Sequence, residues 1–112
     1  MLGLQHSVLR YSDDQAPSAD DVEDFLRKHP DVSHVSMIHS ETTSGIINPV
    51  EEIISRVHSV GSAKKRGVFV DSMSSYGAYH LDMEKYGIDF AATSTNKCVQ
   101  GVPGMAVVIA NL

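Results

Sequence analysis

Three short polar segments carry the side chains that could do chemistry in this 112-residue chain. Each follows a run of β-forming residues, and they span residues 39–45, 71–75 and 93–98. Together they hold a cluster of hydroxyl groups, the carboxylate of Asp71 and the amine of Lys97. Taken singly, such residues are turn formers, helix caps or a solvated lysine. Because the carboxyl ends of parallel strands meet at one edge of a sheet, we expect the three segments to form one site.

Asp71 and Lys97 have the two chemistries that pyridoxal phosphate requires of a protein. A partly desolvated lysine amine attacks carbonyl carbons, which is the first requirement for a Schiff base with this cofactor. A carboxylate keeps the pyridine nitrogen protonated, so that the ring can draw electrons from the substrate. At about 4 Å and an effective dielectric constant near 20, that charge contributes about 4 kcal/mol, or about three pK units. Neither an amide nor a hydroxyl could supply this effect.

Three helices are predicted between the β-forming runs. One begins at Ser18, and a short one covers residues 82–86. The middle helix is expected to begin with Asn48 and Glu51 as a capping pair and with Pro49 at its first helical position. Its apolar stripe consists of Val50, Ile53, Ile54 and Val57. These signals place a helix before or after each of the polar segments.

The β-forming runs predict five strands, at residues 6–11, 32–39, 67–71, 88–94 and 105–110. Strands that alternate with helices are typical of a parallel sheet with right-handed crossovers, so the fold class is α/β. Residues 68–70 and 90–92 are apolar without alternation, which is expected of strands covered on both faces. No internal repeat, low-complexity tract or linker divides the chain.

Composition excludes several classes of function. The net charge of −5 predicts no nucleic-acid or anionic-membrane surface. No apolar run approaches the roughly 20 residues needed to span a bilayer, and the N-terminus lacks the pattern of a signal peptide. The single cysteine, Cys98, excludes an internal disulfide and fits a reducing compartment. We therefore expect a cytoplasmic globular protein, with Cys98 packed in the interior.

Metal binding is not predicted either. The six histidines show no paired spacing typical of a metal site, and His34 and His39, five residues apart on one predicted strand, should point to opposite faces.

Ordered blocks at residues 39–49, 71–77, 87–90 and 96–104 resemble the class V aminotransferases, most closely their 2-aminoethylphosphonate–pyruvate branch. The resemblance covers most of the chain and is weakest before Asp31. It implies a fold type I large domain that binds pyridoxal phosphate, with a mostly parallel sheet and crossover helices. Nothing in the chain resembles the family's upstream glycine-rich phosphate loop or its C-terminal small domain. Residues 1–112 are therefore expected to be part of the cofactor-binding large domain.

The resemblance also implies roles for five residues. Lys97 looks like the Schiff-base lysine, which also moves the proton during the reaction, and Asp71 looks like the partner of the pyridine nitrogen. Thr42 resembles the hydroxyl residue near the phenolic oxygen of the ring. Met73 stands where the family packs a side chain against the ring face, and Asn96 is expected to help hold the phosphate.

The implied reaction transfers an amino group from 2-aminoethylphosphonate to pyruvate and yields phosphonoacetaldehyde and L-alanine. A serine–pyruvate or alanine–glyoxylate type of reaction is the alternative within the family, because few substrate-binding residues are expected in this chain. A non-catalytic, truncated form of either enzyme is the alternative outside it. The family implies a homodimer for a full-length form, with a small-molecule amino donor and a 2-oxo acid as the reaction partners.

Overall fold

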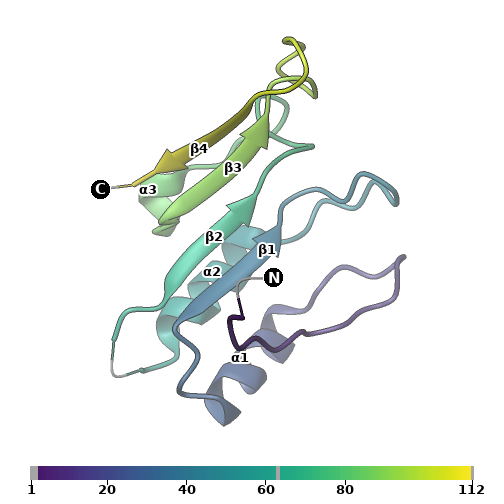
Figure 1. Ribbon diagram of the computed structural model, residues 1–112. Helices are drawn as coiled ribbons and strands as arrows, with labels where there is room; N and C mark the ends of the chain where they lie inside the picture. Colours follow the sequence, from purple (N-terminus) through teal and green to yellow (C-terminus); the bar gives the residue numbers. More distant parts are fainter. Residues whose placement is uncertain (1–2, 63, 112) are drawn as a thin grey trace.

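The computed structural model describes residues 3–62 and 64–111 (Figure 1). In chain order the elements are α1 (Ala19–Lys28), β1 (His34–Ile38), α2 (Val50–Ser59), β2 (Gly67–Asp71), α3 (Met83–Tyr86), β3 (Phe90–Ser94) and β4 (Ala106–Ala110). The strands form one sheet in the order β1-β2-β3-β4. The first three strands are parallel, and β4 runs antiparallel to β3. The prediction of an α/β fold with a mostly parallel sheet and crossover helices is confirmed.

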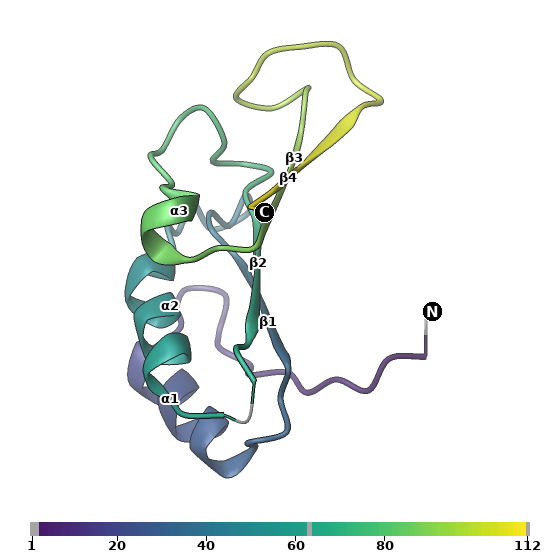
Figure 2. The same cartoon turned by 90° about the vertical axis from the view of Figure 1, so that its left-hand side faces the viewer.

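The helices lie on one face of the sheet (Figure 2). The buried core between the two layers is aliphatic, because the inward stripes of α1 and α2 meet alternate residues of β2. Its largest members are Leu26, Ile53, Ile54, Val57, Val68, Val70 and Ile88. The prediction that residues 68–70 and 90–92 are covered on both faces is wrong. Phe69 is half-buried and Phe90 is 46% exposed, since no described helix lies over their face.

Two of the three predicted helix starts are confirmed in detail. The Ser18 hydroxyl accepts a hydrogen bond from the backbone N–H of Asp21 at the start of α1. The Asp82 carboxylate accepts one from the N–H of Lys85 at the start of α3. Gly87 ends α3 with φ of 68°, a left-handed conformation that a residue without a Cβ adopts at low cost.

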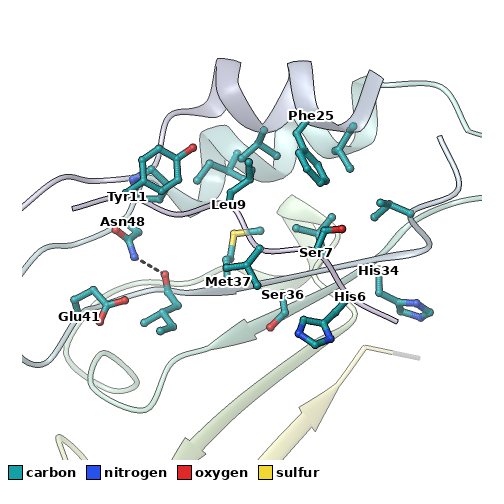
Figure 3. Close-up of a pocket in the computed structure, with 18 of the residues that line it drawn as sticks. His6, Ser7, Leu9, Tyr11, Phe25, His34, Ser36, Met37, Glu41 and Asn48 are labelled. Carbon is teal, nitrogen blue, oxygen red and sulfur yellow. Dashed lines mark hydrogen bonds between the residues drawn. The ribbon is translucent and has the colours of Figure 1, made fainter. Parts of the chain in front are cut away.

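The predicted start of α2 is wrong by one position. The helix begins at Val50, Pro49 is its N-cap, and no side chain caps it. The amide of the buried Asn48 instead donates a 2.9 Å hydrogen bond to the carbonyl of Ile38 (Figure 3). This partly buried bond replaces the cap because it also satisfies the end of β1. Asn48 therefore joins the segment before α2 to the sheet.

Residues 6–11 do not form the predicted strand. A strand requires a neighbour that accepts and donates its backbone hydrogen bonds. Among the described residues, β1 forms a ladder with β2 alone, and no strand pairs with residues 6–11. Their β-forming composition is therefore not sufficient to make a strand here.

Candidate active site

The carboxyl ends of β1, β2 and β3 lie at the same edge of the sheet, where their arrowheads point the same way (Figure 1). Asp71, the last residue of β2, is in register with Ile38 of β1 and Ala92 of β3. The backbone N–H of His39 donates to the carbonyl of Asp71 at 2.8 Å. The pairing therefore brings the three polar segments that follow these strands to one rim.

Asp71 uses one carboxylate oxygen to shape the loop after β2. Its Oδ1 accepts a 2.9 Å hydrogen bond from the backbone N–H of Met73, the local turn that an aspartate favours. Its Oδ2 has no hydrogen-bond donor among residues 3–62 and 64–111. Met73 follows as a 40% exposed side chain. A half-buried carboxylate with one free oxygen therefore stands at the middle of the rim.

Hydrogen bonds join the loops after the three strands. The hydroxyl of Thr42, from the loop after β1, pairs with the hydroxyl of Ser74 in the loop after β2. The thiol of Cys98, from the loop after β3, donates to the backbone carbonyl of Ser74 at 3.4 Å. Cys98 is exposed, so the prediction of an interior cysteine is wrong. Its neighbours form a loop that projects beyond the sheet (Figure 2) and leaves its side chain open to solvent.

Lys97 precedes Cys98 and is exposed. Its carbonyl accepts the N–H of Gln100 at 2.8 Å, and the N–H of Gly101 donates to the carbonyl of Thr95 at 2.7 Å. These bonds close the turn that carries Lys97 and the equally exposed Asn96. In the part of the chain that the structure describes, the Lys97 amine forms no hydrogen bond or ion pair. It lies in solvent, and not in the partly desolvated environment expected of a nucleophilic lysine.

His39 is a rim residue that the sequence did not single out. Its side chain is only 5% exposed and meets the ring of Tyr79 edge-on, with 6.3 Å between the ring centroids. Burial lowers the pKa of His39, and the negative charge of Glu51 opposes that effect in part. Its Nδ1 has no partner in the described structure. The sequence feature that indicates this residue is a histidine directly at the end of a predicted strand. The histidines are interpreted above only as candidate metal ligands.

A large hollow of about 1160 Å³ lies between β1, α1, the N-terminal segment and the loop after β1, which contributes Glu41 and Thr43 to its lining (Figure 3). Tyr11, Phe25 and Met37 are among its lining residues. None of the five predicted site residues lines it. We therefore place the candidate site at the rim and not in the hollow.

The polar groups at the rim fit pyridoxal phosphate. A carboxylate with a free oxygen suits a protonated ring nitrogen, a hydroxyl suits the ring oxygen, and an unpaired amine suits the aldehyde carbon. Thr42, Asp71 and Lys97 provide these three groups on adjoining segments.

No cluster of three metal-ligating side chains occurs within residues 3–62 and 64–111. In the same ranges, no helix is long and apolar enough to cross a membrane.

A family model described as aminotransferase class-V matches residues 2–111. The chain belongs to the class V aminotransferases. The match extends over nearly the whole chain, so the family is assigned on more than the blocks around Asp71 and Lys97. Proteins of this family are pyridoxal-phosphate-dependent enzymes, which agrees with the donors found at the rim.

Curated relatives share about two residues in five with the chain. The 2-aminoethylphosphonate–pyruvate transaminase of Aeromonas hydrophila is 42% identical over 111 residues, which are 97% of this chain and 28% of the relative. The transaminase of the same name from Syntrophobacter fumaroxidans is 43% identical over 109 residues, with 97% and 28% covered. The chain thus spans less than a third of the length of these relatives.

Solved structures show the same fold. The pyridoxamine–pyruvate aminotransferase of Mesorhizobium loti is 33% identical, with a TM-score of 0.75 over 88% of this chain and 24% of that one. A cysteine desulfurase from Thermococcus onnurineus is 25% identical, with a TM-score of 0.76 over 97% of this chain and 25% of that one. In both cases the matched region is about a quarter of the solved chain.

Proposed function

We propose that this chain is part of the cofactor-binding large domain of a pyridoxal-phosphate-dependent aminotransferase. The observation that carries the proposal is the convergence of Thr42, Asp71 and the Lys97 turn on one rim, joined through Ser74. We also place the reaction in the cytoplasm, on the strength of the single cysteine and the class of relatives. A homodimer is the proposed state of a full-length form.

Each site residue has a separate task. When bound, pyridoxal phosphate supplies a ring that withdraws electrons from the substrate carbon. The free Oδ2 of Asp71 would keep the ring nitrogen protonated, and the Thr42 hydroxyl would donate to the ring oxygen. The Lys97 amine would hold the aldehyde carbon of the cofactor and, when free, would carry the proton from the substrate carbon to that aldehyde carbon. Met73 supports the ring face, and Asn96 contributes to holding the phosphate.

The proposed donor is 2-aminoethylphosphonate and the proposed acceptor is pyruvate, which yields phosphonoacetaldehyde and L-alanine. The support is the name shared by the two relatives that match 97% of the chain. A bifunctional phosphonoacetaldehyde hydrolase/aminoethylphosphonate transaminase from Clostridioides difficile is also 39% identical over 110 residues. A serine–pyruvate or alanine–glyoxylate type of reaction is the alternative pair of substrates.

A non-catalytic role is the second candidate. One observation favours it: one face of the sheet carries exposed apolar residues such as Phe90.

A half-reaction assay tests the proposal and separates its alternatives. The purified chain is loaded with pyridoxal phosphate, incubated with 2-aminoethylphosphonate, serine or alanine, and monitored for the pyridoxamine form of the cofactor. We expect conversion with 2-aminoethylphosphonate and no conversion in Lys97→Ala. Conversion with serine or alanine alone would refute the proposed donor. A loaded chain that converts no donor would support the non-catalytic role.

A further inference from the structure

Ser74 occupies the point where the three loops of the rim meet. Its hydroxyl pairs with Thr42, 32 residues earlier, and its carbonyl accepts the thiol of Cys98, 24 residues later. Ser74 therefore contacts the loop after β1 and the loop after β3 while it belongs to the loop after β2. Its side chain is only partly buried, so the hydroxyl is at the surface of the rim and not in the core.

Two neighbouring serines of the same loop, Ser72 and Ser75, do not make these connections. The Ser72 hydroxyl donates to the carbonyl of Ala92 within the sheet at 3.0 Å. The Ser75 hydroxyl donates to the carbonyl of Ser72 in its own loop at 3.4 Å. Both side chains are almost fully buried and have structural roles. Among the described serines of this loop, Ser74 is the one bonded to the residue expected to face the ring.

A bond from Ser74 changes what Thr42 can do. A hydroxyl has one proton to donate and two lone pairs to accept with. Thr42 is exposed, and without a partner its hydroxyl would turn freely in water. When Ser74 donates to Thr42, the Thr42 proton remains free for an acceptor on the open side of the rim. The Cys98 contact holds the turn that carries Lys97 against the same residue.

We propose that Ser74 is a positioning residue: its hydroxyl orients Thr42 toward the cofactor ring, and its carbonyl keeps the Lys97 turn at the rim. Ser74 itself does not touch the cofactor. This inference rests on the proposed function, since it assigns the direction in which Thr42 donates. It adds a sixth residue to the site, and that residue acts only through its neighbours.

Three variants test the inference. Ser74→Ala removes the hydroxyl and keeps the carbonyl, Ser74→Thr restores a hydroxyl, and Ser44→Ala is the control, a serine of the exposed loop after β1. The first readout is amide hydrogen exchange at Glu41 and Gly45, whose N–H groups bond within the Thr42 loop. We expect exchange about five-fold faster in Ser74→Ala, the equilibrium value of one ordinary hydrogen bond. Ser74→Thr and Ser44→Ala should match the unmodified chain.

The second readout is the absorption spectrum of bound pyridoxal phosphate as a function of pH. A hydrogen bond to the ring oxygen alters the pH at which the bound cofactor changes colour, and a purely structural contact does not. We expect Ser74→Ala to shift this transition and Ser74→Thr to restore it. A shift in exchange with an unchanged spectral transition would overturn the positioning role, as would no change in either. If the unmodified chain binds no cofactor at Lys97, the proposed function fails, and hydrogen exchange alone decides whether Ser74 joins the loops.

Discussion

The two carboxylate oxygens of Asp71 have different environments. Oδ1 accepts the N–H of Met73 and shapes the loop, whereas Oδ2 is free among the described residues. An asparagine would keep an oxygen for Met73 and lose the negative charge. The structural and the chemical role of this residue can therefore be separated by one substitution.

We expect Asp71→Asn to fold normally and to slow the cofactor-dependent half-reaction on the order of 1000-fold. The reason is the loss of about 4 kcal/mol of interaction with a protonated ring nitrogen at about 4 Å. Half-reaction rates and thermal unfolding of the two proteins measure both effects. Asp82→Asn, at the cap of α3, is the control and should keep the rate. An Asp71→Asn rate within about two-fold of the unmodified protein would contradict this role.

His39 should make stability depend on pH. Burial lowers its pKa below the ordinary 6.5, so the folded state keeps it neutral where the unfolded chain takes up a proton. The unfolded state then binds more protons as pH falls below 6.5, and stability decreases until the lowered pKa of the folded state is reached. Above 6.5 the full stability is present.

Urea unfolding between about pH 7 and about pH 5 measures this effect. His39→Gln, which cannot take up a proton, should lose less stability over that range than the unmodified chain. The other histidines are common to both proteins and cancel in the comparison. Equal losses in the two proteins would show that His39 does not carry the pH dependence.

At the scale of single residues, the sequence could predict which residue types form the candidate site and at which edge of the sheet they lie. Asp71 and Lys97 follow strong β-forming runs, so their placement depends on local signals. The exposure of Cys98, the burial of His39 and the Ser74 contacts depend on how loops from three strands fold over one another. No local pattern contains that information.

Among the elements, α2 shows how a tertiary contact overrides a local signal. Asn48 and Glu51 have the spacing of a capping pair, yet Asn48 bonds to Ile38 of β1. In contrast, the caps of α1 and α3 were predictable because Ser18 and Asp82 each accept from a backbone N–H three residues later in the same helix. The strand at residues 6–11 failed for a related reason, since a strand depends on a neighbour that composition does not reveal.

The position of Asn48 leads to a prediction that separates its two possible roles. Serine is as good a helix cap as asparagine, but it is too short to reach the Ile38 carbonyl. We expect Asn48→Ser to destabilise the fold by about 1 kcal/mol, the net contribution of one hydrogen bond that is only partly buried. Chemical unfolding measures the difference. Unchanged stability would mean that Asn48 acts as a cap after all.

For the whole molecule, the notable feature is the sheet face without helices. Phe90 and the 62% exposed Val108 lie on it, and apolar surface of this kind promotes association. We expect the chain to self-associate at high concentration and Val108→Lys to reduce this association. Leu4→Lys, which removes a 74% exposed apolar side chain from the N-terminal segment, is the control. Sedimentation velocity that shows the same size distribution for both variants would contradict the prediction.

The residues proposed for the site are assigned more contacts to the cofactor ring than to its phosphate. The chain spans 28% of the two transaminases that it matches over 97% of its own length. Cofactor capture is therefore a more direct test of the rim than turnover, since it depends only on residues that the chain contains.

The most direct measurement is titration of the purified chain with pyridoxal phosphate, followed by borohydride reduction and peptide mapping. Reduction fixes the cofactor on the amine to which it is bonded. If the three strand ends form a cofactor site, the phosphopyridoxyl group will be found on Lys97 alone, and Asp71→Asn will weaken its capture. Label that is absent, or spread over other exposed lysines such as Lys64 and Lys85, would contradict a cofactor site at this rim.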